Sequence, residues 1–300
     1  MIEWVGGMAV DKVDALAGAV IQHGPENRRI FVMDWQVNPD AQAAAVFRKE
    51  AQRLGYTKVI AKVSESFGQG FLDEGYVIEA VIPGFFQGVE DAWLLSCFLD
   101  PARERMPLDT ELRIKDVLAT AQAKEVEPPS SLGASYRWIR CSNDMSGAMA
   151  AVYSEVFATY PFPITEPAYI EATMNEKSVW YYAVMDLEDE IAALAAAEFN
   201  PRAMAVEMTD FATVPKHRGQ GLAQFLLRQM EGDVAHQGVK TAFTIARAVS
   251  YGMNRTFHRL GYQFGGTLVN NTNIAGQLES MNIWYKPLDT PGESCDCSGI

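Results

Sequence analysis

The stretch VPKHRGQGLAQFLLRQMEG, residues 214–232, places two glycines and a cluster of basic residues directly before an apolar pattern with helical spacing. The apolar positions of this pattern are Leu222, Phe225, Leu226 and Met230. Such spacing puts one apolar stripe of a helix against a sheet. The stretch therefore predicts a glycine-containing loop that leads into a helix, in a protein of the α/β class.

The start of a helix suits a phosphate group, because its first backbone N–H groups lack intrahelical acceptors and the helix dipole makes this end partly positive. Gly219 and Gly221 let the backbone approach a phosphate closely, and Arg218 adds a charge-assisted hydrogen bond. The loop lacks the Gly-Lys-Ser/Thr ending of nucleoside triphosphate loops and the acidic residue of dinucleotide sites. We interpret it as a pyrophosphate-binding loop; a surface turn with solvated Lys216, His217 and Arg218 is the alternative.

Composition narrows the class of partner. The chain has 300 residues, of which 48% are hydrophobic, and a formal net charge of −13. This charge argues against nucleic acid or an anionic membrane surface as the main partner, because both bind basic surfaces. The chain shows no secretory signal and no apolar run of roughly 18 residues, so we expect a soluble, cytoplasmic protein. The four cysteines form neither a disulfide framework nor a zinc pattern, and no metal is expected: Cys97, Cys141, Cys295 and Cys297.

The order of patterns along the second half of the chain predicts a mixed sheet flanked by helices. Strand-like runs lie at 136–141, 178–186, 190–200, 203–214, 241–246, 263–269 and 280–286. The second, third and fourth of these runs indicate an antiparallel meander, because only short turns separate them. Helical patterns precede the meander, follow the glycine loop, and connect the run at 241–246 to the last two strands.

The first half of the chain repeats part of this order. Residues 45–86 run helix, Gly, strand, helix, Gly-Tyr, strand, and WLLSCFL at 93–99 is a last strand. The second half has Gly238 and the pair Gly261-Tyr262 at similar places, which indicates an internal repeat. Where the second copy has HRGQGLA, however, the first has NPDAQAA. We therefore expect one pyrophosphate site per chain.

The glycine loop also resembles a known family. Arg218-Gly219-Gln220-Gly221-Leu222-Ala223 is similar to the acyl-coenzyme A pyrophosphate loop, R/Q-x-x-G-x-G/A, of the GNAT superfamily of N-acetyltransferases, and it follows a strand as in that family. Five further segments resemble the β-lysine N-acetyltransferases of this superfamily: YPFPI, VEMTDFAT, TAFTIARAVSYGMN, GTLVNNTNI and ESMNIWYKPL. These matches lie in the second half of the chain, and the first half agrees only in general layout.

The resemblance implies both a fold and an activity. The fold is a GNAT-like mixed sheet flanked by helices, preceded by a degenerate N-terminal half-GNAT-like domain. We expect four segments: the degenerate domain without a coenzyme loop at 1–105, a linker with a helix at 106–134, the catalytic GNAT domain at 135–288 and a flexible tail at 289–300. The implied reaction moves acetyl from acetyl-CoA to the N6 amine of β-lysine and gives the compatible solute N6-acetyl-β-lysine. A lysine 2,3-aminomutase would supply the acceptor.

Two carboxylates are candidates for the base of this reaction. An alkylammonium with a pKa near ~10.4 must lose a proton before it can attack a thioester. Glu207 and Asp210 lie on the strand before the loop, and Glu207 falls where the resemblance places a catalytic glutamate. Because side chains alternate along a strand, the two face opposite sides unless a bulge intervenes. We prefer Glu207 as the base, with Asp210 as the alternative or as the partner of a substrate ammonium.

The resemblance also assigns residues to the coenzyme, and the backbone of residues 211–213 would bind its pantetheine arm. The full set is Phe211, Ala212, Thr213, Arg218, Gly219, Gln220, Gly221, Leu222, Ala223, Ser250, Asn254 and Phe257. Phe257 departs from the family, because many members have there a Tyr that protonates the leaving thiolate. Tyr251, a water molecule or unassisted departure of the thiolate remain as alternatives.

The acceptor carries a carboxylate and a second ammonium, which need a cation and an acceptor group. Arg247 is the first candidate for the carboxylate, and a structural or solvated Arg is the alternative. Asn270 and Asn271 belong to a polar segment, 270–273, that we expect to form a loop at the acceptor pocket, or a plain turn. Tyr160, together with Phe162, would cover the site or belong to the core.

Three functions are compatible with these sequence features. The first is an enzyme that acetylates β-lysine or another small diamine or amino acid. The second acetylates protein lysines or N-termini, and the third is a non-catalytic module that binds acetyl-CoA. The intact loop and Glu207 favour an enzyme, and YPFPI and the segment 270–273 favour a closed pocket for a small molecule. A homodimer is compatible with the pattern.

Overall fold

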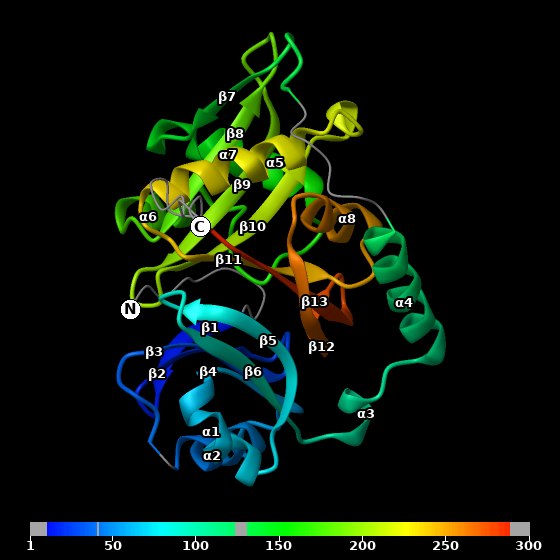
Figure 1. Ribbon diagram of the computed structural model, residues 1–300. Helices are drawn as coiled ribbons and strands as arrows, with labels where there is room; N and C mark the ends of the chain where they lie inside the picture. Colours follow the sequence, from blue (N-terminus) through cyan, green and yellow to red (C-terminus); the bar gives the residue numbers. More distant parts are fainter. Residues whose placement is uncertain (1–10, 41, 124–130, 289–300) are drawn as a thin grey trace, which may run out of the picture.

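The computed structural model describes residues 11–40, 42–123 and 131–288. Its strands form a single 13-stranded sheet in the order β1-β2-β3-β4-β6-β5-β12-β13-β11-β10-β9-β8-β7 (Figure 1). The first six strands belong to one half of the chain and the last seven to the other. The expected tail at 289–300, with Cys295 and Cys297, lies outside the described residues.

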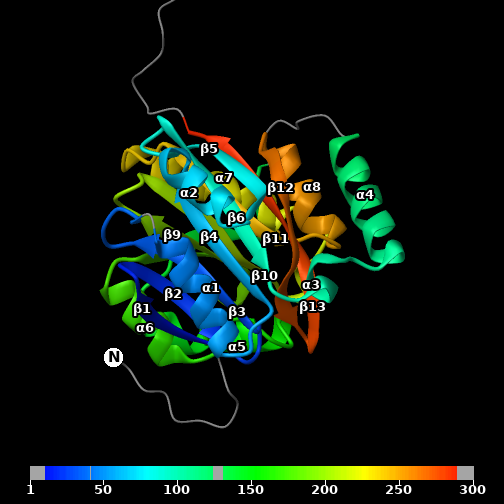
Figure 2. The same cartoon turned by 90° about the horizontal axis from the view of Figure 1, so that it is seen from below.

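The described residues of the N-terminal half form six strands, and α1 and α2 pack on one face of their sheet (Figure 2). Its elements are β1 (Lys12–Leu16), β2 (Ala19–Gly24), β3 (Arg29–Trp35), α1 (Ala43–Arg53), β4 (Lys58–Ser64), α2 (Glu65–Asp73), β5 (Val77–Phe86) and β6 (Glu90–Phe98). The connecting segment then forms α3 (Pro101–Glu104) and α4 (Leu108–Gln122), and α4 packs against α8 of the second half. The strands β1 to β3 were not among the sequence predictions.

The C-terminal half contains the mixed sheet that the sequence predicts. Its elements are β7 (Arg137–Arg140), α5 (Ser146–Val156), α6 (Pro167–Asn175), β8 (Val179–Met185), β9 (Ile191–Asn200), β10 (Ala205–Thr213), α7 (Leu222–His236), β11 (Thr241–Arg247), α8 (Tyr251–Arg259), β12 (Gln263–Ile274) and β13 (Gln277–Pro287), with short 3-10 helices at Asn143–Met145 and Pro215–His217. The meander β8-β9-β10 is antiparallel, and β10 pairs with β11 in parallel.

Burial explains why the central strands have their composition. The strand β9 is rich in alanine and buried along most of its length, because α5 packs against one side of it and α7 against the other. The helix α7 buries the apolar stripe that its spacing predicts, including Leu222, Leu226 and Met230. None of the helices in the described ranges is long and apolar enough to cross a membrane.

The two halves share one strand arrangement. The strand β3 lies between antiparallel β2 and parallel β4, as β10 lies between β9 and β11. The order β4-β6-β5 then matches β11-β13-β12. Even an irregularity recurs, because a register shift falls between Ile78 and Ala80 in the first half and between Phe264 and Gly266 in the second. The repeat seen in the sequence is therefore a repeat of topology.

The halves join through equivalent strands. Ala80 of β5 pairs antiparallel with Gly266 of β12, and these residues follow the recurring register shift in their own halves. Antiparallel pairing between equivalent positions is the arrangement that a two-fold axis produces. An apolar cluster lies under the junction and includes Ile60 and Phe85 from the first half and Phe243 and Ile283 from the second. The sheet and this cluster make the halves one packed unit.

One sequence expectation about this region is wrong. The segment 270–273 is not a loop, because β12 continues through it to Ile274. The ladder between β12 and β13 is interrupted between Leu268 and Thr272, and Asn270 has a positive φ of 44°. The polar residues that suggested a turn therefore occupy a bulge within a long strand.

The close approach of β5 to β12 leads to a testable prediction. A methyl group added at Gly265 would overlap the backbone carbonyl oxygen of Val81, so Gly265→Ala forces the two strands apart. We expect the free energy of unfolding to fall by about 1–3 kcal/mol in chemical denaturation. The control is Gly70→Ala in α2, where an added methyl group meets nothing within 4 Å. That variant should gain about 0.5–1 kcal/mol; an equal loss in both variants would contradict the packing argument.

Candidate active site

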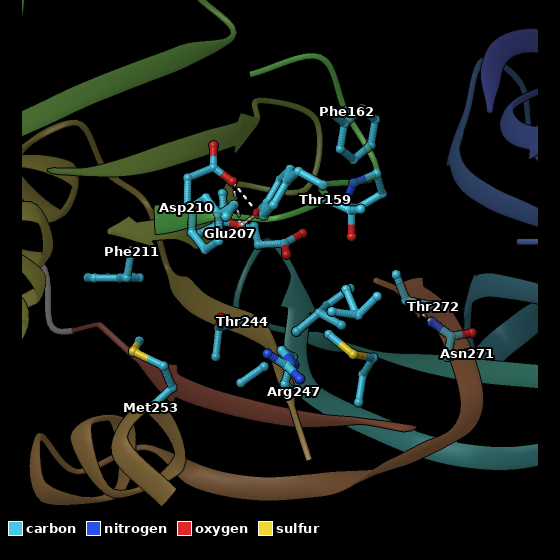
Figure 3. A pocket seen from close by; sticks show the side chains of 18 of the residues that line it. Thr159, Phe162, Glu207, Asp210, Phe211, Thr244, Arg247, Met253, Asn271 and Thr272 are labelled. Atoms are coloured by element: carbon cyan, nitrogen blue, oxygen red, sulfur yellow. Dashed lines mark hydrogen bonds between the residues drawn. The ribbon is translucent and has the colours of Figure 1, made fainter. Parts of the chain in front are cut away.

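The site lies where β10 and β11 diverge. The two strands pair only from Ala205 to Glu207 on one side and from Thr241 to Phe243 on the other, although both strands continue further. A cavity of about 380 Å³ opens beyond this point, and both halves of the chain line it (Figure 3). Beyond Glu207, β10 pairs with β9 along one edge. Its other edge faces the gap, where the backbone can bind an extended ligand.

A bulge in β10 determines which side chains face this cavity. The pairing with β9 shifts between Thr209 and Ala212, and Asp210 has a positive φ of 55°. Without the bulge, alternation along the strand would turn Glu207 and Asp210 to opposite sides of the sheet. With it, both carboxylates line the cavity. The strained backbone at Asp210 therefore brings the two candidate bases to one site.

The surroundings of Glu207 raise the pKa of its carboxyl. Burial raises the pKa of its carboxyl to about 7, and Asp210 adds to the rise while Lys62 opposes it. A hydrogen bond from the backbone of Ile245 also favours the ionised form. Directly across the ladder lies Glu198, whose pKa burial and Glu207 raise well above its ordinary value. The pKa of Glu207 thus lies closer to neutral pH than that of an ordinary carboxyl, and a second acid lies beside it.

Two side-chain hydrogen bonds hold the carboxylate of Asp210 in place. Its carboxylate accepts hydrogen bonds from the hydroxyls of Tyr160 and Thr209. Burial raises the pKa of Asp210 to about 6, while these two hydrogen bonds lower it. Tyr160 lies in the segment YPFPI, and Phe162 of the same segment also lines the cavity. Figure 3 shows the side chains around Asp210 and Phe162 on the same side of the cavity.

The glycine loop has the conformation that its sequence predicts. Gly219 and Gly221 have φ values of 80° and 74°, in the left-handed region, and Gly221 is the residue that precedes α7. Of the three basic residues here, Lys216 and His217 lie within 3.5 Å and 3.3 Å of the Asp186 carboxylate. Only Arg218 is directed to the strand end, where its Nε donates to the Thr213 carbonyl at 3.2 Å.

The remaining residues assigned to the coenzyme differ in their surroundings. Phe211, Ser250 and Phe257 line the cavity, and the rings of Phe211 and Phe257 meet edge to face at 5.6 Å.

Asn254 is fully buried, and its side chain forms hydrogen bonds with other residues of the protein. Its amide donates to the carbonyls of Arg247 and Ser250, and its oxygen accepts from Asn282 and Trp284. Ala212 and Leu222 are buried, Thr213 and Ala223 are partly exposed, and Gln220 is exposed at the loop.

The alternative acid Tyr251 lies elsewhere. Its side chain is 41% exposed, and its hydroxyl donates to Asp116 on α4. It is not among the residues that line the cavity. The cavity wall at the family's Tyr position is the apolar ring of Phe257.

The residues assigned to the acceptor differ in whether they line the cavity and in whether their side chains already have partners. Arg247 lines the cavity, but its guanidinium forms two hydrogen bonds with the Glu279 carboxylate, at 2.7 and 2.6 Å. Asn271 lines the cavity as well. The amide of Asn270 instead donates to the carbonyls of Arg103 and Arg105, so this side chain serves the contact between the halves.

Several residues of the cavity wall were not predicted from the sequence. Four come from β2 and β3 of the first half: Gln22, Arg29, Phe31 and Met33. The alternating runs AVIQHG and RIFVMDW around a Pro-containing turn would have indicated these strands. Their place at the cavity follows from the junction between the halves, which no local pattern encodes. Glu198 was missed too, although a lone Glu at the end of an alanine-rich strand is a visible signal.

The described residues contain no group of three or more His, Cys, Asp or Glu side chains placed to hold a metal ion. Of the residues that the resemblance to N-acetyltransferases assigns to the coenzyme and the base, five line the cavity: Glu207, Asp210, Phe211, Ser250 and Phe257. The residues of the glycine loop, 218–223, are not among those that line it.

Residues 149–262 match the acetyltransferase (GNAT) family. The β-lysine N(6)-acetyltransferase of Methanococcus maripaludis is 33% identical over 92% of this chain and 99% of its own length. The N-acetyltransferase YodP of Bacillus subtilis is 35% identical over 90% of this chain and 96% of its own length. Among solved structures, the ribosomal-protein-S18-alanine N-acetyltransferase from Escherichia coli aligns with a TM-score of 0.46 and 17% identity, over 53% of this chain and 97% of that one. The chain therefore belongs to the GNAT family and is an N-acetyltransferase that uses acetyl-CoA.

Proposed function

We propose that this enzyme transfers the acetyl group of acetyl-CoA to the N6 amine of β-lysine, with Glu207 as the base. The observation that carries the proposal is a carboxylate whose pKa is raised to about 7, inside a cavity that begins where β10 and β11 diverge. A base works best when its pKa lies near the pH at which it operates. The relative from Methanococcus maripaludis, which matches over nearly its full length, supports the choice of acceptor.

In this reaction the acceptor nitrogen loses two protons, and its new bond to carbon replaces the bond between carbon and sulfur. Glu207 removes the first proton from the ammonium of the acceptor, directly or through water. The free amine then forms a bond to the acetyl carbon, the bond between that carbon and sulfur breaks, and the nitrogen releases its second proton to water. Asp210 is held by Tyr160 and Thr209 and places a second negative charge near the incoming ammonium. Phe257 has no proton to give, so the thiolate leaves unassisted or takes its proton from water.

The coenzyme would lie along the open edge of β10 and end at the glycine loop. Backbone groups of Phe211 to Thr213 face the gap between the diverging strands. The N-terminus of α7 is suited to the pyrophosphate, and the left-handed glycines keep the loop free of side chains that would block it. Arg218 adds the one cation of this loop that no carboxylate of the described residues holds.

The proposed product fits a role as a compatible solute. β-Lysine carries two ammonium groups and one carboxylate, and acetylation of one amine leaves a zwitterion without net charge. Such a molecule can accumulate without a counterion. A lysine 2,3-aminomutase, which moves the α-amino group of lysine to the β position, would supply the acceptor.

An acceptor panel tests the proposed function. We expect purified enzyme with acetyl-CoA to release thiol fastest with β-lysine, among β-lysine, α-lysine, ornithine, spermidine and a lysine peptide. Mass spectrometry of the product should place the acetyl group on N6. Activity confined to the peptide would contradict the proposal, and coenzyme binding without any thiol release would favour a non-catalytic module.

The Glu207→Gln variant tests the base. We expect kcat/KM to fall by ~10²–10⁴-fold, because general base catalysis contributes about that much. The wild-type pKa of Glu207 is about 7, and only the ionised form accepts a proton. The kcat/KM of the wild type should therefore decrease as the pH falls below about 7, and this limb should vanish in Glu207→Gln. The exposed Glu188→Gln is the control. A full rate in Glu207→Gln across this range would exclude Glu207 as the base.

Two neighbouring cations test the coenzyme loop. Arg218→Gln should raise the Kd of acetyl-CoA by about 10- to 100-fold, because it removes a hydrogen bond between charged groups. Lys216→Gln is the matched control, since Lys216 already faces Asp186 at 3.5 Å and should contribute little. Calorimetric titration of both variants measures the difference. Equal weakening would mean that only the general charge of the loop matters.

A further inference from the structure

The wall of the cavity that faces away from the catalytic carboxylates contains a buried cation from the first half of the chain. Arg29 lies at the start of β3, lines the cavity and is only 3% exposed. Its Nη1 donates to the Asn271 carbonyl at 2.6 Å and to the Thr272 hydroxyl at 3.2 Å, and its Nη2 donates to the Gln22 side chain at 3.3 Å. Its Nε is buried and has no hydrogen-bond partner.

Asn271 lies beside Arg29 and carries an unpartnered acceptor. Its side chain is 2% exposed and lines the cavity. The amide nitrogen donates to the Thr272 hydroxyl at 3.4 Å, but the Oδ1 atom is buried and has no partner. Figure 3 shows Asn271 and Thr272 on the side of the cavity opposite Asp210 and Phe211. One end of the cavity thus holds a free donor on a cation next to a free acceptor.

No carboxylate in the described parts of the chain forms an ion pair with Arg29. The charge of Asp11 raises the pKa of Arg29, but the carboxylate of Asp11 accepts hydrogen bonds from Asn27. Arg103, close by, also donates only to carbonyls and to a Thr hydroxyl. Burial lowers the pKa of Arg29 to about 9 and that of Arg103 to about 10, although both remain cations near neutral pH.

A buried guanidinium without an anionic partner is costly, because its desolvation is not offset by an ion pair. The cost is explained if a ligand brings the anion. A carboxylate matches the planar guanidinium, and an ammonium matches the unpartnered amide oxygen. An amino acid presents both groups close together at one end of the molecule.

We propose that Arg29 binds the carboxylate of the acceptor and that Asn271 accepts a hydrogen bond from its second amine. This subsite rests on the proposed function, since it holds the far end of the acceptor while the N6 amine lies at Glu207. The first half of the chain, which has no glycine loop of its own, thereby selects amino acids over plain diamines. Arg247 is less suited to the carboxylate, because Glu279 already holds its guanidinium through two hydrogen bonds.

Three acceptors separate the two contacts. β-Lysine has both groups, 1,4-diaminopentane is the same molecule without the carboxylate, and 6-aminohexanoate lacks the second amine. With wild-type enzyme, we expect kcat/KM for each analogue to be about 10- to 100-fold below that for β-lysine, as expected for the loss of a hydrogen bond to a charged group. This comparison needs no variant and would overturn the proposal if 1,4-diaminopentane were acetylated as well as β-lysine.

The variants then assign each contact to a residue. Arg29→Gln should lower kcat/KM for β-lysine and 6-aminohexanoate by about 10- to 100-fold relative to kcat/KM for 1,4-diaminopentane. Asn271→Ala should lower kcat/KM for β-lysine and 1,4-diaminopentane relative to kcat/KM for 6-aminohexanoate. Because each ratio compares substrates on the same protein, a general loss of folded enzyme cancels. Arg29→Lys, which keeps the charge, should recover part of the discrimination.

Controls distinguish this subsite from the proposed function itself. The exposed Arg28→Gln is the matched control for charge and should keep the wild-type ratios. A uniform loss with all three acceptors in Arg29→Gln, or a selective loss of carboxylate acceptors only in Arg247→Gln, would overturn the subsite. The proposed function would survive both results. It would fail instead if wild-type enzyme bound acetyl-CoA but acetylated none of the three.

Discussion

Three consecutive backbone carbonyls in the bulge of β12 need hydrogen-bond donors that β13 does not supply. The ladder is interrupted between Leu268 and Thr272, and the donors come from buried cations of the first half. They are Lys58 to Val269 at 2.8 Å, Arg103 to Asn270 at 2.6 Å and Arg29 to Asn271 at 2.6 Å. A buried carbonyl without a donor is costly. The second half therefore cannot present this bulge without the first, and the wall of the cavity depends on the contact.

The junction also fixes the distribution of charge along the cavity. Glu198, Glu207 and Asp210 gather where the strands diverge, and Arg29 lies at the opposite wall beside Asn271. Lys58 is neutralised locally by Glu79, whose carboxylate also receives the Val269 amide. Arg29 has no such neighbour among the described residues, so carboxyl groups lie at one wall of the cavity and an unpaired cation at the other. A dipolar acceptor with an ammonium at one end and a carboxylate at the other matches this arrangement.

The parts that sequence could predict are those governed by local patterns. The meander, the glycine loop and α7 follow from alternation, breakers and helical spacing, and the structure confirms them. The sequence could predict the side of the sheet on which Asp210 lies only for each of two cases, with and without a bulge in β10. The bulge itself depends on how β10 pairs with β9. The strand through 270–273 looked like a turn because Asn-rich segments usually form turns. Its extended form depends on Arg29 and Arg103, which are more than 160 residues away in the chain.

The repeated topology explains why the first half lines the cavity although it has no glycine loop of its own. Arg29 and Ala205 stand at equivalent places, since each begins the parallel pairing of its half, with Lys58 and Thr241 respectively. Two residues further on, Phe31 therefore matches Glu207. Both line the same cavity, Phe31 with an apolar ring and Glu207 with a carboxylate. The first half has neither the glycine loop nor a carboxylate at this position, but side chains of its β3 line the same cavity as those of β10. The junction at Ala80 and Gly266 thus brings the two equivalent strands to one cavity, where β10 supplies a carboxylate and β3 supplies part of the opposite wall.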